Sequence, residues 1–132
     1  MSRENHLVLA VVTAPPGVLL LHRPGETPPA VLPGGRPEAR ESPGATAERG
    51  CLEETRVRIR AGRQLGRLVS DGIATTYVAA RPLVEPPVGE AAVSLHVAWY
   101  TLNQVELVLP ELWEPVRAHL ERCFAREHFP GR

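Results

Sequence analysis

A helix start at Ser42-Pro43 divides the chain into two groups of strand-forming segments. Serine suits the N-cap because its oxygen accepts a hydrogen bond from an unpaired backbone amide. Proline suits the first helical position, where no amide donor is needed. The helix is predicted to run to about Thr55. Strands on both sides of one central helix predict an α/β fold with a mixed β-sheet between helices.

The remaining elements follow from apolar runs and the turn signals between them. Ala14-Pro15-Pro16-Gly17 separates the first two runs, which predicts a hairpin, and Ser70-Asp71-Gly72 predicts a second one. A terminal helix is predicted from Pro110 to about residue 128, because apolar residues recur there at helical spacing. The predicted strands are residues 6–13, 18–23, 65–69, 74–80 and 95–102.

Length and charge exclude several classes of protein. The 132 residues suit one domain, residues 1–132, and leave no room for two cores. The formal net charge is zero, so neither a nucleic acid polymer nor a membrane surface is an expected partner. All basic residues are arginines, which excludes lysine-based chemistry. The first residues lack the apolar core of a signal peptide, so we expect a cytoplasmic protein.

Glutamates gather before and at the end of the predicted helix. Two follow the Gly34-Gly35 turn, and two lie about three helical turns further on. Carboxylates that converge would repel one another unless a cation joined them, and hard oxygen ligands favour magnesium or manganese. Such an ion would clamp a pyrophosphate and polarise it for attack by water. Taken one by one, these features are also typical of an ordinary turn and a solvated helix face. The four glutamates are Glu38, Glu41, Glu53 and Glu54.

The spacing of these residues resembles the Nudix box. Its pattern is Gly, five residues, Glu, seven residues, then Arg-Glu-apolar-x-Glu-Glu-x-Gly-apolar, and the match covers 23 residues without a gap. The preceding LPGGRPE segment and the late strand with Trp99 are also similar to that family. The matching positions are Gly35, Glu41, Arg49, Cys51, Glu53, Glu54 and Val57.

The resemblance implies the Nudix α/β/α sandwich and metal-assisted hydrolysis of a nucleoside diphosphate linked to another moiety. It implies that Glu53 and Glu54 are catalytic metal ligands and that the Gly35 carbonyl also faces the metal. Glu41 and Arg49 would brace the loop against the helix. The metal would be Mg²⁺ or Mn²⁺, and the ligand a small nucleotide derivative. Glu38 is a further metal-ligand candidate, and Arg23 and Arg36 are candidates for holding the substrate phosphates.

Two positions depart from the box. Gly50 stands where the family has a glutamate that is a principal metal ligand, and glycine inside a helix costs about 1 kcal/mol relative to alanine. We therefore expect weaker metal binding. Arg56 stands where a glycine normally ends the helix in the left-handed conformation, so a reshaped helix end is expected. Arg40 also replaces a small residue that is frequent in the family.

Two functions stay open from the sequence. The first is a weakened or altered pyrophosphohydrolase, in which Glu90 in the late loop is the better candidate for an additional carboxylate. The second is a catalytically inactive Nudix domain that binds a nucleotide or a partner, and Gly50 is the reason to consider it. A homodimer is a further expectation for a domain of this kind.

Overall fold

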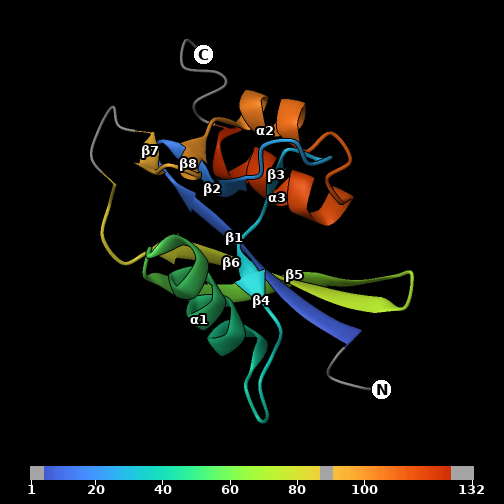
Figure 1. Ribbon diagram of the computed structural model, residues 1–132. Coiled ribbons are helices and arrows are strands. Elements are labelled where there is room, and N and C mark those ends of the chain that lie inside the picture. Colours follow the sequence, from blue (N-terminus) through green and yellow to red (C-terminus); the bar gives the residue numbers. More distant parts are fainter. Residues whose placement is uncertain (1–4, 87–90, 126–132) are drawn as a thin grey trace.

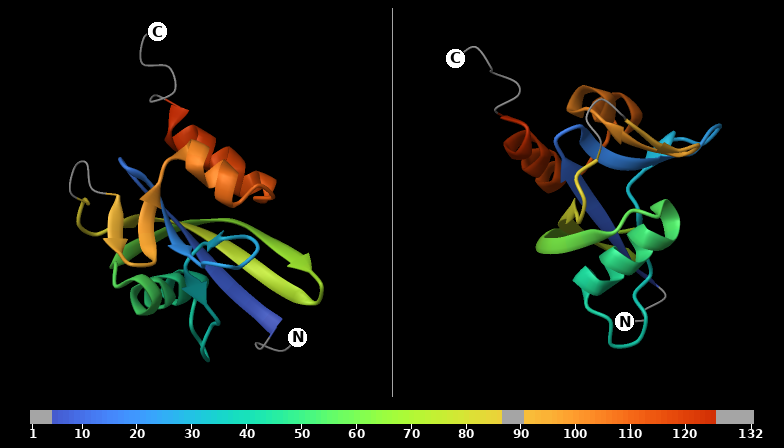
Figure 2. Two further views of the ribbon diagram at one scale, coloured as in Figure 1. Left: turned by 45° about the horizontal axis from the view of Figure 1, so that its top comes forward. Right: turned by 90° about the vertical axis from the view of Figure 1, so that its left-hand side faces the viewer.

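The computed structural model describes residues 5–86 and 91–125. Helix α1 (Pro43–Thr55) covers one face of a mixed sheet, while α2 (Leu102–Val108) and α3 (Glu114–Cys123) cover the other face (Figures 1 and 2). None of the helices in these residues has the length and apolar character needed to cross a membrane. The strands are β1 (His6–Ala14), β2 (Gly17–His22), β3 (Ala30–Val31), β4 (Gly34–Gly35), β5 (Ile59–Ser70), β6 (Ile73–Pro82), β7 (Ala92–Ser94) and β8 (Val97–Tyr100).

Strand β1 is the centre of the sheet. The strand order is β5-β6-β1-β2-β8-β7, with β3 paired to β2 and β4 paired to β1. Strand β1 runs parallel to β6 and antiparallel to β2 and β4. The predicted α/β class with a mixed sheet is therefore confirmed.

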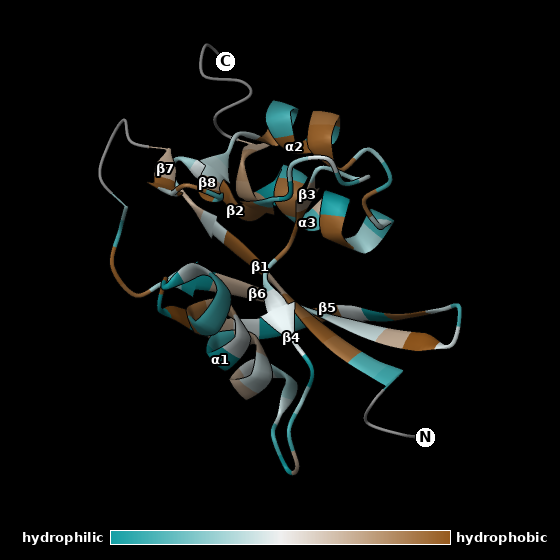
Figure 3. Ribbon diagram, viewed as in Figure 1, coloured by the Kyte–Doolittle hydropathy of each residue, from teal (hydrophilic) through white to brown (hydrophobic). Residues whose placement is uncertain are grey.

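Side chains on the two faces of β1 pack in two separate apolar clusters. Val8, Ala10 and Val12 point toward α1 and pack in one buried cluster with Cys51, which is fully buried. Val11, on the alternate face, packs in a second cluster with residues of α2 and α3. Period-two alternation along a strand that is covered on both sides requires apolar residues at nearly every position. Figure 3 shows this apolar character along β1.

The predicted hairpin around Ser70-Asp71-Gly72 is confirmed as β5–β6. Asp71 and Gly72 both have positive φ, 54° and 78°, and Ser70 pairs directly with Ile73. Two central residues with positive φ define a type I′ turn, whose twist matches that of the flanking strands. The hairpin carries β6 into the sheet beside β1.

The C-terminal third differs from the prediction. Of the expected strand at residues 95–102 only β8 is extended, as one half of a hairpin with β7. A separate helix, α2, precedes Pro110, and the expected helix from Pro110 begins only with α3. A capping box starts α2: the Thr101 hydroxyl accepts from the Gln104 amide, and the Gln104 side chain accepts from the Thr101 amide. Pro110 lies between the helices, and residues 126–128 of the predicted helix fall outside the described residues.

Candidate functional site

The start of α1 is fixed by two side-chain hydrogen bonds. The Ser42 hydroxyl accepts from the Ala45 amide at 3.1 Å, which confirms the predicted N-cap. The Thr46 hydroxyl donates to Glu41 Oε1 at 2.8 Å. Glu41 is thereby held against the first turn of the helix, at the end of the loop that follows β4.

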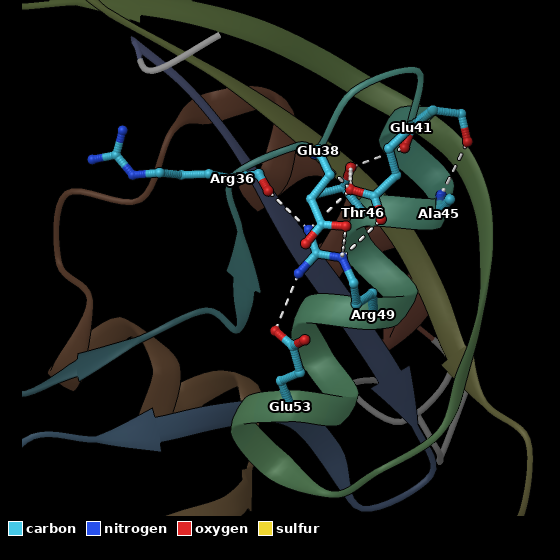
Figure 4. A network of polar contacts seen from close by, with 8 residues as sticks. Arg36, Glu38, Glu41, Ala45, Thr46, Arg49 and Glu53 are labelled. Carbon is cyan, nitrogen blue, oxygen red and sulfur yellow. Dashed lines mark hydrogen bonds and ion pairs between the residues drawn. The ribbon is translucent and has the colours of Figure 1, made fainter.

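Arg49 joins this loop to the helix (Figure 4). Its guanidinium donates to both oxygens of Glu41, with Nε–Oε2 at 2.7 Å and Nη2–Oε1 at 2.9 Å. It also donates to the Arg36 carbonyl at 2.8 Å and to Glu53 Oε1 at 3.1 Å. Glu38 Oε1 lies 4.0 Å from Nε. The cation among these three carboxylates is therefore an arginine of the chain itself.

The Glu41 carboxylate is strongly stabilised in its charged form. Hydrogen bonds from Arg49, and then from the Glu38 backbone amide, lower its pKa from 4.5 to about 2. The Glu41 side chain is 14% exposed, whereas that of Glu53 is 63% exposed. Glu41 is thus a fixed part of the scaffold, and Glu53 is the carboxylate that solvent reaches.

Glu54 lies apart from this network, against β4. Its Oε1 accepts a hydrogen bond from the Gly34 amide at 2.8 Å. Partial burial of the carboxylate raises its pKa, while the bond from Gly34 acts in the opposite direction. Glu53 and Glu54 therefore end α1 in different surroundings, one beside Arg49 and one beside the glycine backbone.

Gly50 is the contact point between α1 and β4. A Cβ added at Gly50 would lie 2.6 Å from the C and O atoms of Gly34, and a Cβ at Gly34 would lie 2.0 Å from the Val8 carbonyl oxygen. The β4 backbone is thus held between β1 and α1 with no room for side chains. The space next to the helix at this position is filled by the Gly34 carbonyl group. Gly50 therefore has a packing role that the helix sequence alone does not indicate.

The expected reshaping of the end of α1 is wrong. Arg56 adopts the left-handed conformation itself, with φ 66° and ψ 11°, and its amide donates to the Leu52 carbonyl at 2.9 Å. Arg40 in the preceding loop also has a positive φ, 64°. The chain keeps a left-handed backbone at both positions without glycine, at a cost of about 1–2 kcal/mol each.

A family model described as the NUDIX domain matches residues 5–123. The chain belongs to the Nudix family. Members of this family act on small nucleotide derivatives and generally use divalent metal ions. No curated protein matches the sequence.

Solved Nudix structures share the fold. A NUDIX hydrolase from Nitrosomonas europaea is 20% identical, with a TM-score of 0.62 over 97% of this chain and 90% of that one. An ADP-ribose pyrophosphatase from Streptococcus suis is 18% identical, with a TM-score of 0.59 over 83% of this chain and 95% of that one. A MutT protein from Methanosarcina mazei is 22% identical, with a TM-score of 0.57 over 93% and 94% of the two chains.

The four carboxylates predicted to share one metal ion lie in two places in this Nudix domain: Glu38, Glu41 and Glu53 lie around Arg49, and Glu54 lies against β4. Across residues 5–86 and 91–125, no group of three or more His, Cys, Asp or Glu side chains could hold a metal ion. Glu53 and Glu54 each have one oxygen engaged, by Arg49 and by Gly34. Magnesium is often bound by only one or two carboxylates together with substrate phosphates and water. The donor set therefore fits a hard divalent ion that arrives with a phosphate-bearing ligand.

A large cavity lies on the α2–α3 side of the sheet. Its volume is about 590 Å³, within the range of small-molecule sites, and its lining is mostly apolar. Tyr77 and Trp113 line it with their ring centroids 5.2 Å apart. Leu32 and Leu9 also line it, and Leu9 is the cross-strand partner of Gly34. The cavity therefore extends to the segment that leads into the Nudix box.

The other predicted site residues are more scattered. Arg23 is exposed after β2, and its side chain contacts none of the box carboxylates that the structure describes. The Arg36 side chain extends away from the Arg49 network, although its carbonyl takes part (Figure 4). Glu90 lies outside the described residues. The Gly35 backbone lies against α1, because a Cβ at Gly35 would be 3.7 Å from the Gly50 Cα.

The sequence reasoning missed two groups of residues. Thr46 and the Gly34 amide orient Glu41 and Glu54, and a threonine at the fourth residue of the helix was the available signal for the first. Tyr77 and Trp113 line the cavity from β6 and from the turn before α3. Their positions in the sequence, far apart and in different elements, carried no signal.

Proposed function

We propose that this protein hydrolyses the pyrophosphate bond of a nucleoside diphosphate linked to another moiety, at a reduced rate. One observation carries the proposal: Glu54 lies against the Gly34 amide at the end of α1, with Glu53 next to it on Arg49, and the segment before Gly34 lines an aromatic cavity. Carboxylates next to a glycine turn suit a metal-bound diphosphate, and an apolar cavity suits the base or the linked group.

In this proposal Glu53 and Glu54 hold Mg²⁺ or Mn²⁺ together with the substrate phosphates. The ion, when bound, polarises the diphosphate toward attack by water. Arg49 orients Glu53 through the 3.1 Å contact and anchors the loop through Glu41. Arg23 and Arg36 supply guanidinium groups on the loops beside the box, where they can pair with phosphate oxygens.

The reduced rate follows from the donor set. The family glutamate at position 50 is absent, and the Gly34 backbone fills the adjacent space. Loss of a carboxylate that acts in proton transfer typically lowers a rate by about 10²–10⁴-fold. Glu90 is the remaining candidate for a further carboxylate at the site.

Turnover assays with matched variants test this function. A panel of nucleoside diphosphate derivatives that includes ADP-ribose is assayed with Mg²⁺ and with Mn²⁺. We expect slow cleavage that is lost in Glu53→Gln and in Glu54→Gln. Glu48→Gln is the control, because Glu48 lies on the same helix but accepts from the Ala61 amide of β5 at 2.8 Å. Activity that persists unchanged in both site variants would exclude this site.

The close packing at Gly50 favours a second candidate, a Nudix domain that binds a nucleotide without cleaving it. The Gly34 backbone lies so close to Gly50 that no side chain fits there without a shift, and this supports a site that works without a carboxylate at position 50. Binding is measured as a ligand-dependent rise in melting temperature. A clear rise with a nucleotide and metal, together with no product at long incubation, would favour this second function over hydrolysis.

A Gly50→Glu variant does not separate these two functions cleanly. The first side-chain carbon would already lie 2.6 Å from the Gly34 carbonyl group, so α1 must move before a glutamate fits. Absence of activity in that variant would reflect a displaced helix as much as an inactive site. The paired substitutions at Glu53 and Glu54 are the better test, because replacing a carboxylate with an amide of the same size does not require α1 to move.

A further inference from the structure

A second, smaller hollow lies at the opposite end of β1 from the Nudix box. Its volume is about 190 Å³, and it forms where the ends of β1 and β6 meet the last turn of α3. It shares no lining residue with the aromatic cavity. The lining residues are Thr13, Ala14, Pro15, Arg81, Cys123 and Phe124.

Thr13 contributes a residue with a hydroxyl group to the lining of this hollow. The residue is only 3% exposed, yet its hydroxyl makes no hydrogen bond within residues 5–86 and 91–125. Every fully buried polar side-chain atom of the described residues has a hydrogen-bond partner. Because the Thr13 hydroxyl has none among them, it is not fully buried and solvent reaches it. Polar groups at buried positions are normally hydrogen-bonded. The Thr13 hydroxyl therefore has unused donor capacity at the wall of the hollow.

One arginine lines the hollow together with Thr13, and a second lies opposite it in the sheet. Arg81 lines the hollow, and its direct cross-strand partner is Arg60; both are exposed. Like charges in directly opposite positions of a sheet are destabilising unless an anion lies between them. Neither arginine forms an ion pair with a carboxylate in the part of the chain that the structure describes.

Two more arginines act on His119 of α3, whose Nε2 lies 3.4 Å from the sulfur of Cys123 at the hollow. The pKa of His119 is lowered, first by partial burial and then by the charges of Arg63 and Arg122. These arginines too have no ion pair among the described residues. The formal net charge of the whole chain is zero, so this local excess of positive charge is balanced by negative charges elsewhere in the molecule.

Two ordinary roles account for only part of this arrangement. Exposed arginines on the edge strand β5 discourage pairing with other chains, which explains Arg60 and Arg63. Arg122 in the last turn of α3 offsets the negative end of the helix dipole. Neither role applies to Arg81, which lies on an interior strand, or to the unpartnered hydroxyl of Thr13.

We propose that this hollow binds a small phosphate-bearing anion, with the Arg81 guanidinium and the Thr13 hydroxyl donating to its oxygens. The planar guanidinium matches the geometry of phosphate oxygens, and a hydroxyl adds a donor from a second direction. Arg60, Arg63 and Arg122 supply the surrounding positive potential. The hollow is small, which limits the bound group to a phosphate or a diphosphate.

Calorimetric titration of the full chain with inorganic phosphate, and separately with pyrophosphate, tests the proposal at constant ionic strength. We expect binding that is weakened about tenfold or more in Arg81→Gln, because a charge-assisted hydrogen bond is lost. Thr13→Val, which is nearly isosteric, should weaken it less. Arg56→Gln removes the same charge from the α1 side of the sheet and should bind as the wild type does.

The comparison of variants decides the outcome. Loss in Arg81→Gln with retention in Arg56→Gln supports the hollow as the site, and the tighter of the two ligands identifies the preferred group. No binding by the wild type overturns the proposal, as does equal binding by wild type and Arg81→Gln. Equal loss in Arg81→Gln and Arg56→Gln also overturns it, because only net charge would then matter. If Thr13→Val does not fold, the two arginine variants still give the result.

Discussion

Replacing Gly50 with alanine places one methyl group at the contact between α1 and β4. Helix propensity alone predicts that this change stabilises the protein by about 1 kcal/mol. The structure predicts the opposite sign. The new Cβ would lie 2.6 Å from two backbone atoms of Gly34, whereas ordinary van der Waals contact begins at 3.4 Å. Backbone atoms held between β1 and α1 cannot rotate away, so the helix itself has to move.

The magnitude follows from two opposing contributions. Forcing an extra carbon into a packed interior costs about 1–3 kcal/mol. The propensity gain of about 1 kcal/mol offsets part of that cost. We therefore expect Gly50→Ala to lower the free energy of unfolding by up to about 2 kcal/mol.

Gly44→Ala in the same helix is the matched control. Its added Cβ would meet only the Ala61 side chain, at 3.3 Å, which a small shift relieves. We expect this variant to be as stable as the wild type or slightly more stable. Urea denaturation of both variants gives the comparison. A Gly50→Ala protein as stable as Gly44→Ala would refute the close backbone contact.

Three further predictions concern backbone strain, pH and the cavity. Arg56→Gly should raise the free energy of unfolding by about 1 kcal/mol in urea titrations, because glycine adopts the left-handed conformation without strain; a loss of stability would contradict this. Glu41 has a folded-state pKa of about 2 against 4.5, so its contribution to stability is complete above pH 4.5 and is lost as the pH falls toward 2. Glu41→Gln should therefore lower the melting temperature near neutral pH, and a difference from wild type that did not shrink toward pH 2 would argue against the Arg49 contact. Gly66→Ala would place a Cβ 2.7 Å from Trp113 Cη2 and push the indole ring toward the cavity. It should reduce the melting shift produced by a bound nucleotide, and an unchanged shift would exclude Trp113 from the binding site.

Local signals in the sequence were sufficient for α1 and for the β5–β6 hairpin. Ser42 and Pro43 fix the helix start through their own atoms, and Asp71-Gly72 suits a turn with two positive φ values. Such features depend on neighbours within a few residues, so a single sequence contains them. The capping box at Thr101 was also local, but it follows directly on strand-forming residues that concealed it.

Features made by contacts between distant segments could not be predicted. The Gly50 contact depends on how closely β4 approaches α1, and nothing in the helix records that distance. The sequence predicted that glutamates gather near a cation, but not that the guanidinium of Arg49 occupies the centre of three of them. The aromatic cavity combines residues of β1, β3, β5, β6 and the α2–α3 turn, which only the folded chain brings together.

The shared guanidinium of Arg49 makes ligand loading and loop order thermodynamically linked. A cation bound at Glu53 Oε1 competes with Arg49 for this oxygen and weakens the 3.1 Å contact. The released donor can turn only to solvent or to the acceptors on the loop, Glu41 and the Arg36 carbonyl. Linkage is reciprocal, so whatever tightens the loop on Arg49 also makes Glu53 easier to load. Through this one side chain, occupancy at the end of α1 is coupled to the order of the loop before the helix.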